Sequence, residues 1–350
     1  MLVKVSFNKK FWKNKRVFIT GHTGFKGSWL FFLLIQKGAI VHGYSKNYSN
    51  NHKTFKNLTF SRMQTIGDVN NYKDLKKSLK SFRPHIILHL AAQPLVLQSY
   101  KNSYQTFLTN IFGTINLLEI SKNINSLKSI CLVTTDKVYD EDYTSNYFHE
   151  NDRLGGKDPY SSSKVSKEII AKSYYESFLK QKKISLFTVR AGNVIGGGDW
   201  SKNRLIPDIF RAYRSKKKLI IRNQNHTRPW QHVLDVLDAY LKLTEYSCYK
   251  LLNDSWNIGP KRSKQKNVIE LVNLFKKRLA FEYRILNNKN SEYESNFLQL
   301  NNKKIRNDIG WQSNFDLNNS IDWTIDWYLN NDNNLNKTIN QINKFIKKYD

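Results

Sequence analysis

Three glycines placed between an apolar run and a helical segment constrain the fold of this chain more than any other feature. Residues 16–20 have the pattern of a buried strand, and the apolar stretch from Trp29 to about Gln36 has the length of a helix. Between them lie Gly21, Gly24 and Gly27. Glycine permits a tight turn and lets backbone N–H groups approach a pyrophosphate at the positive end of a helix. With a further strand at 39–44, the pattern predicts a nucleotide-binding βαβ unit.

The first half of the chain alternates strand and helix patterns, which predicts an α/β fold with a doubly wound parallel sheet of the Rossmann type. Further strands are expected at residues 63–68, 85–90, 129–134 and 185–189, and helices at 72–82, 104–121 and 160–180. The run at 85–90 is apolar on both faces, as in a central parallel strand. We therefore expect a dinucleotide-binding domain over residues 11–192.

Beyond residue 192 the alternation loosens, and glycine, proline and tryptophan occur in expected loops. We expect residues 193–330 to form a smaller substrate-binding lid that interleaves with the sheet domain, with parts of 193–260 returning to it. Residues 331–350 are expected to be a tail that ends in a short amphipathic helix around 339–346.

Composition excludes several classes of protein. The formal net charge is +29, but the lysines are spread along the chain among many asparagines and no RNA-binding signature accompanies them, so we expect no nucleic-acid partner. Residues 2–10 lack the apolar core of a signal peptide, and no apolar run is long enough for a membrane span. Cys131 and Cys248 have no metal-ligand spacing, and we expect reduced thiols, a cytoplasmic protein and no metal site.

Tyr160 and Lys164, here called the tyrosine–lysine pair, are four residues apart in an expected helix and so share one face. A free tyrosine is a poor base at neutral pH, but a nearby ammonium and an oxidised nicotinamide favour its phenolate. The pair follows Thr135, which comes directly after the strand expected at 129–134. Because ligands bind outside the carboxyl ends of parallel strands, these residues indicate a catalytic site beside a nicotinamide cofactor.

At this point the chain resembles the extended short-chain dehydrogenase/reductases that act on nucleotide sugars, from about Phe11 to Trp327. Within that family it is similar to the CDP-glucose 4,6-dehydratases. The resemblance is carried by the stretches FWKNKRVFITGHTGFKGSWL, HLAAQPLV, TTDKVYD, DPYSSSK, VRAGNVIGGGDW, RLIPDI and RPWQHVLD. It implies a tightly held NAD, transient oxidation of the sugar at C4, loss of water across C5 and C6, and return of hydride to C6. A deoxysugar for a surface polysaccharide is the expected end product.

The same resemblance implies the residues of the site. Those expected to contact the cofactor are Gly21, Thr23, Gly24, Phe25, Gly27, Asp68, Val69, Ala91, Ala92, Gln93, Tyr160 and Lys164. Those expected to contact the nucleotide diphosphate or the sugar are Asn193, Arg204 and Arg228, and His232 is added because it lies near Arg228 in the sequence. Thr135 would hydrogen-bond the sugar 4-hydroxyl. Asp136 and Lys137, here called the acid–base pair, would eliminate water, with Asp136 as acid and Lys137 as base at C5. A lysine can act as a base only when it is uncharged.

Several alternatives stay open on the sequence. The end of the expected second strand has Lys46 and no carboxylate, which leaves NAD and NADP both possible, and the resemblance favours NAD. A 4-epimerase of the same fold would share Thr135 and the tyrosine–lysine pair but would not need the acid–base pair. A module that binds a dinucleotide without catalysis is the third possibility. The helices expected at 104–121 and 160–180 would pair between subunits, so we expect a homodimer or a homotetramer.

Overall fold

A parallel sheet of seven strands lies at the centre of the computed structural model, which describes residues 7–8, 10–46, 63–143, 147–260, 266–286, 298–329 and 334–349. Across the sheet the strands are Gln64–Ile66 (β3), Ile40–Ser45 (β2), Arg16–Thr20 (β1), Ile86–His89 (β4), Ser129–Val133 (β5), Ser185–Ala191 (β6) and Ser255–Ile258 (β11). Every neighbouring pair is parallel. The strand order reverses between β1 and β4, as in a doubly wound sheet, which confirms the predicted fold class.

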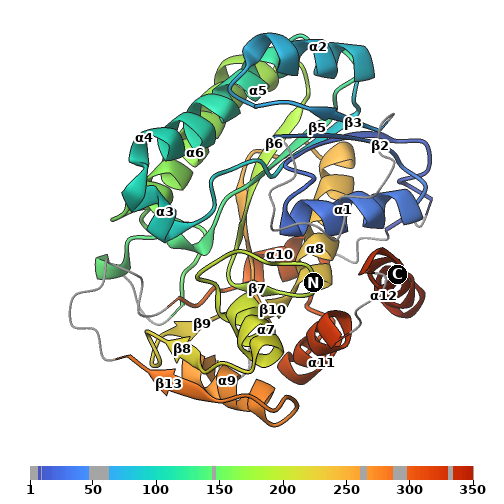
Figure 1. Ribbon diagram of the computed structural model, residues 1–350. Coiled ribbons are helices and arrows are strands. Elements are labelled where there is room, and N and C mark those ends of the chain that lie inside the picture. The colour runs from blue at the N-terminus through green and yellow to red at the C-terminus, as the bar shows by residue number, and fades with distance from the viewer. Residues whose placement is uncertain are drawn as a thin grey trace.

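Helices cover both faces of the sheet (Figure 1). One face carries α2 (Tyr72–Phe82), α4 (Ser103–Phe107), α5 (Gly113–Ser121) and α6 (Pro159–Tyr174), and the other carries α1 (Phe25–Gln36) and α8 (Val233–Tyr249). Successive strand residues point to opposite faces. Phe18 therefore packs in the cluster beneath α2 and α5, and Ile19 packs in the cluster beneath α1 and α8.

The predicted helices of the first half are present with small differences. The helix predicted at 72–82 has the observed bounds of α2, and the one predicted to begin at Trp29 begins at Phe25. A π-helical turn, η2 (Leu108–Phe112), separates α4 from α5, and another, η5 (Tyr175–Leu179), extends α6. The short helix α3 (Val96–Lys101) was not predicted. Two 3₁₀ turns follow β5, at Asp136–Val138 (η3) and Glu141–Tyr143 (η4).

The second half of the chain forms the smaller region and also returns to the sheet. β11 adds the seventh strand next to β6, and α8 packs under β5 and β6. The remaining strands are Val194–Ile195 (β7), Leu219–Ile221 (β8), Thr227–Arg228 (β9), Gln231–His232 (β10), Lys266–Asn267 (β12) and Tyr283–Ile285 (β13). They pair as β7 with β10, β8 with β13 and β9 with β12. The remaining helices are α7 (Leu205–Ser215), α9 (Val268–Lys276), α10 (Lys303–Ile309), α11 (Leu317–Leu329) and α12 (Asn334–Tyr349).

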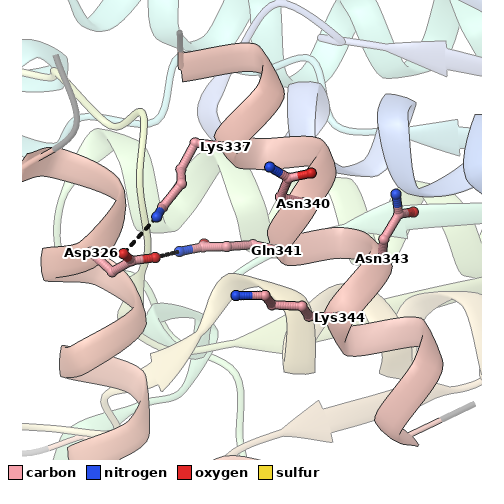
Figure 2. Close-up of a pocket in the computed structure, with 6 residues that line it drawn as sticks. All are labelled: Asp326, Lys337, Asn340, Gln341, Asn343 and Lys344. Carbon is pink, nitrogen blue, oxygen red and sulfur yellow. Dashed lines mark hydrogen bonds and ion pairs between the residues drawn. The ribbon is translucent and has the colours of Figure 1, made fainter. Parts of the chain in front are cut away.

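Helix α12 is longer than the amphipathic helix expected at 339–346, and it packs on the rest of the protein. Ile342 and Phe345 are buried in the main core cluster. On the outer side, Asp326 of α11 receives Lys337 Nζ at 2.6 Å and Gln341 Nε2 at 3.0 Å (Figure 2). The expected tail is therefore largely part of the folded core. Residues 2–6 and 9, which bear on the expectation of no signal peptide, lie outside the described residues. Within the described ranges, no helix combines the length and apolarity needed to cross a bilayer.

Candidate active site

The glycine-rich turn joins β1 to α1 and leaves no space for side chains. A Cβ on Gly27 would lie 2.0 Å from the carbonyl oxygen of Gly21, and a Cβ on Gly21 would lie 2.7 Å from the backbone nitrogen of Ala91. Gly21 also has a φ of +77°, which favours glycine. Gly24 is the N-cap of α1 and supplies no side-chain cap. The first turn of the helix is thus uncapped by a side chain, which suits an anionic ligand.

The other residues expected to contact the cofactor come from the turn after β1, the start of α1 and the segment after β3. Thr23 is half-buried, and its backbone nitrogen donates to Ser45 Oγ at 3.3 Å. Asp68 follows β3 and forms an ion pair with Lys46, whose Nζ lies 2.7 Å from Asp68 Oδ2. The side chains of Phe25 and Val69 are buried in the two core clusters, so these two residues can offer a ligand little more than their backbone.

The loop after β4 is fixed by hydrogen bonds to the neighbouring elements. Ala91 N donates to Thr20 Oγ1 at 3.2 Å, and Ala92 is half-buried beside it. Gln93 N donates to Asn110 Oδ1 at 2.8 Å, and its side-chain Nε2 donates to Thr106 Oγ1 at 2.9 Å. The backbone of this loop faces the glycine turn, as the contact between Gly21 and Ala91 requires, while the Gln93 side chain is engaged with α4.

Helix α6 begins so that the tyrosine–lysine pair faces the end of β5. Asp158 caps the helix, since its Oδ1 accepts from Tyr160 N at 2.9 Å and from Ser161 N at 3.1 Å, and Pro159 occupies the first turn. Lys164 Nζ donates to the carbonyl oxygen of Val133 at 3.2 Å and lies 5.8 Å from the centre of the Tyr160 ring. The structure therefore brings the pair together at the carboxyl end of β5.

Burial is the largest influence on the pKa values of the tyrosine–lysine pair. It raises the pKa of Tyr160 to about 12, against the opposing effects of a hydrogen bond with Thr135 and the charge of Arg204. Burial and the charge of Lys26 lower the pKa of Lys164 to about 7. The phenolate was predicted beside both an ammonium and an oxidised nicotinamide, and this remains a prediction.

The acid–base pair lies in the turn η3, directly after β5. Thr135 caps this turn, and its Oγ1 donates to Asp136 Oδ1 at 3.1 Å. The other carboxyl oxygen, Oδ2, is buried and has no hydrogen-bond partner among the described residues. Burial raises the pKa of Asp136, although Lys137 and Arg228 oppose the shift. Lys137 is half-buried beside it.

Further cations converge on this position from the smaller region and from α1. Arg204 Nη1 lies 3.0 Å from Asp199 Oδ2, and Arg204 lies close enough to Tyr160 to lower its pKa. Arg228 is buried and donates to Thr227 O at 2.9 Å. Lys26 Nζ lies 3.4 Å from the Tyr240 hydroxyl, and burial with the charge of Arg204 lowers the pKa of Lys26 to about 8.

Two other expected residues differ in how well they fit the site. Asn193 is half-buried, and its carbonyl oxygen accepts from Gln231 N at 3.1 Å. His232 was expected to contact substrate, and this remains a prediction; its Nε2 is buried without a hydrogen-bond partner among the described residues. Its side chain is fully buried, its ring centre is 4.8 Å from that of Phe315, and its Nδ1 accepts from Leu234 N at 3.3 Å as the cap of α8. Burial lowers its pKa to about 3, so His232 is a neutral core residue.

Sequence reasoning missed two groups behind the site. Glu168 and Arg190 form a buried ion pair, although Glu168 lies four residues after Lys164, a spacing that could have indicated it. Lys167 is fully buried on the same helix. The residues next to it in the sequence give no sign that this lysine is buried. In the described part of the chain, no group of three or more His, Cys, Asp or Glu side chains is arranged to hold a metal ion.

Comparison with known proteins bears on the family and the fold of the chain. A family model described as GDP-mannose 4,6 dehydratase matches residues 18–324. A CDP-glucose 4,6-dehydratase of Salmonella typhimurium is 40% identical over 306 residues, which is 84% of each chain. Among solved structures, dTDP-glucose 4,6-dehydratase from Bacillus anthracis in complex with NAD has a TM-score of 0.76 at 24% identity, covering 90% of this chain and 96% of that one. UDP-glucose 4-epimerase from Thermotoga maritima, with UDP-glucose, has a TM-score of 0.79 at 21% identity, covering 90% and 98%. The two solved structures support the fold.

Proposed function

We propose that this chain, which belongs to the GDP-mannose 4,6 dehydratase family, converts CDP-glucose to CDP-4-keto-6-deoxyglucose and water with NAD as cofactor. The observation that carries the proposal is a buried carboxyl oxygen of Asp136 without a partner among the described residues, next to Thr135 and the tyrosine–lysine pair. An oxidation at C4 needs only the latter groups, whereas loss of water needs an acid. The 40% identical relative named a CDP-glucose 4,6-dehydratase supports cytidine as the base.

The residues present fit a bound NAD. The glycine turn would hold the pyrophosphate, since any Cβ on Gly27 would collide with the Gly21 carbonyl. At the adenosine end, the carboxylate of Asp68 offsets the charge of Lys46. A 2′-phosphate would meet that carboxylate, which supports NAD over NADP. NAD, when bound, supplies the hydride acceptor at C4 of the sugar and the hydride donor at C6.

The tyrosine–lysine pair would move the proton of the sugar 4-hydroxyl. Tyr160 takes this proton as the C4 hydrogen leaves, with Thr135 hydrogen-bonded beside it and Arg204 favouring its ionised form. Lys164, whose Nζ lies 5.8 Å from the centre of the Tyr160 ring, would when charged favour the phenolate of Tyr160 that accepts this proton. The pair thus fits both the oxidation and the later reduction.

The acid–base pair would carry out the elimination. Burial raises the pKa of Asp136, so its carboxyl group can hold a proton for the departing 6-hydroxyl. Lys137 would take the proton from C5, which the 4-ketone acidifies. Arg204, Arg228 and Asn193 would hold the nucleotide diphosphate and the sugar, since arginine donates two parallel hydrogen bonds to phosphate.

The product decides between this proposal and its alternatives. Purified protein with NAD is offered CDP-, UDP-, GDP- and dTDP-glucose in heavy water. We expect a ketone that absorbs in base, with deuterium at C5, from CDP-glucose. A C4 epimer without ketone would identify an epimerase, and NAD binding without turnover on any sugar would identify a non-catalytic module. The variant Lys137→Met is expected to form NADH from CDP-glucose but no 4-keto-6-deoxy sugar. Full turnover in that variant would reject the role assigned to Lys137.

A homodimer is part of the proposal. Large apolar side chains are exposed on α4, η2, α6 and η5, namely Tyr104 (77% exposed), Phe112 (55%), Ile169 (62%) and Phe178 (40%). Such exposed apolar groups on adjacent helices favour a helical interface between two copies of the chain. Light scattering at micromolar concentration is expected to give at least twice the chain mass, and Phe112→Lys is expected to lower it.

The cellular setting is the last part of the proposal. Cys131 and Cys248 are both free thiols, and Cys131 is buried, which supports a reducing compartment such as the cytoplasm. A 4-keto-6-deoxy sugar nucleotide made there would serve as a precursor of a deoxysugar for a surface polysaccharide. An in vitro sequence of this enzyme and a ketone reductase should yield the reduced deoxysugar nucleotide.

A further inference from the structure

The buried ion pair behind the site is formed by Glu168 of α6 and Arg190 of β6. Arg190 Nε donates to the two carboxylate oxygens of Glu168 at 2.9 and 3.0 Å, and Nη2 donates to Oε2 as well. The two side chains are only 4% and 5% exposed. Removing both charges from water costs free energy, so such a pair depends on further hydrogen bonds to its remaining polar atoms.

Those further hydrogen bonds reach the turn that follows the acid–base pair. Arg190 Nη1 donates to the Tyr139 hydroxyl at 2.8 Å and to Glu150 O at 2.9 Å. The Tyr139 hydroxyl donates in turn to Asn257 Oδ1 at 2.6 Å. The Tyr139 ring stacks on Phe148 with centres 4.6 Å apart and an interplanar angle of 10°. Tyr139 is therefore held at both its ring and its hydroxyl.

The same ion pair also holds the other side of the acid–base pair. Thr134, two residues before Asp136, donates from Oγ1 to Glu168 Oε1 at 2.7 Å. Tyr139 follows Lys137 by two residues and reaches Glu168 through Arg190. Both flanks of the acid–base pair are thus connected to α6, the helix that carries the tyrosine–lysine pair.

From this arrangement, and resting on the proposed function, we propose that Tyr139 is a positioning residue for the elimination step. Through Arg190 and Glu168 it keeps the acid–base pair in register with α6, so that one bound sugar meets both sets of groups. Tyr139 acts through these two side chains and not by contact with the sugar or the cofactor. Displacing a catalytic group by about 1 Å can lower a rate by about 10²-fold, so loss of this connection should slow elimination far more than oxidation.

The test is the variant Tyr139→Phe, which keeps the ring stack on Phe148 and removes only the hydroxyl. With CDP-glucose and NAD, the rate of ketone product and of deuterium entry at C5 should fall at least tenfold, while KM stays within twofold. NADH should accumulate during turnover, because oxidation at C4 precedes the slowed step. In the cofactor-free protein, hydrogen exchange of a peptide covering residues 134–140 should become faster.

Matched controls make the result decisive. Tyr174→Phe removes the hydroxyl of a tyrosine on α6. That hydroxyl donates to Glu119 Oε2 at 3.1 Å and lies outside the site. The variant should leave all of these readouts unchanged. The ratio of accumulated NADH to product is independent of the folded fraction, so a less stable variant still gives an answer. Equal slowing of oxidation and elimination, or unchanged elimination, would overturn the inference. Lack of dehydration in the wild-type protein would instead overturn the proposed function.

Discussion

Replacing Lys167 by methionine should stabilise the cofactor-free protein at neutral pH. Lys167 is fully buried on α6, and its Nζ has no hydrogen-bond partner within the described ranges. Burial, with a smaller effect from the charge of Lys164, holds the pKa of Lys167 well below its ordinary value of 10.5. Burial therefore favours the uncharged amine in the folded protein, whereas the unfolded chain holds the proton at pH 7.

The size of the effect follows from the proton that folding removes. Deprotonating a lysine of ordinary pKa at pH 7 costs about 5 kcal/mol, because each pH unit corresponds to about 1.4 kcal/mol. A buried amine without a partner adds about 1–3 kcal/mol. Methionine has neither cost and adapts well to irregular cores, although repacking can cost about 1.5 kcal/mol. We expect the free energy of unfolding at pH 7 to rise, by up to about 6 kcal/mol where folding removes the proton completely.

The pH dependence gives the sharper signature. Since the folded-state pKa of Lys167 is lowered, the unfolded state binds one more proton at every pH between that value and 10.5. The stability of the wild type therefore rises with pH through this window relative to the variant, and the gap closes by about 1.4 kcal/mol per pH unit. Urea unfolding followed by tryptophan fluorescence at pH 7, 8 and 9 measures this, with Lys172→Met on the exposed side of α6 as control. A variant less stable than the wild type at pH 7, or a gap equal at pH 7 and 9, would refute the reasoning.

Three further variants test the site. Tyr160→Phe should lower kcat by about 10²–10⁴-fold while NAD affinity, measured by calorimetry, changes less than threefold, and near-normal turnover would remove Tyr160 from the mechanism. Gly27→Ala should weaken NAD binding at least tenfold, because its Cβ would lie 2.0 Å from the Gly21 carbonyl oxygen, whereas Gly259→Ala, with its nearest neighbour at 3.4 Å, should bind normally. His232→Ala should lower the free energy of unfolding by about 2–4 kcal/mol and leave KM within twofold; a large rise in KM with unchanged stability would place His232 in the substrate site.

The sheet could be predicted because its signals are local. Three of the four residues of β4, Ile86 to Leu88, are apolar and cover both faces, and the helix pattern at 72–82 repeats on one face, so short windows of sequence were sufficient. The seventh strand, β11, was not predicted as a sheet strand. It has four residues, and its place is fixed by pairing with β6, with Trp256 opposite Val189. Such a long-range partner leaves no periodic signal in the strand itself.

The site could be predicted in its residue types but only partly in its electrostatics. Thr135, the acid–base pair and the tyrosine–lysine pair meet at the end of β5, as the order of the elements implies. His232 was placed with Arg228 because the two are near in sequence. Its ring instead packs against Phe315, about 80 residues away in sequence, which no local pattern reveals. The raised pKa of Tyr160 likewise depends on burial, which only the tertiary structure supplies.

Part of the positive charge of the chain is concentrated around Tyr160, on Lys26, Lys164 and Arg204. Burial and neighbouring cations lower the pKa of Lys26 to about 8 and the pKa of Lys164 to about 7. Arg204 adds a permanent charge next to Tyr160. A diphosphate entering this site would offset the mutual repulsion of these cations and favour their protonated forms. In the proposed mechanism these cations would face the ligand and also tune the catalytic groups, so we expect ligand binding and proton transfer to change together between about pH 7 and 8.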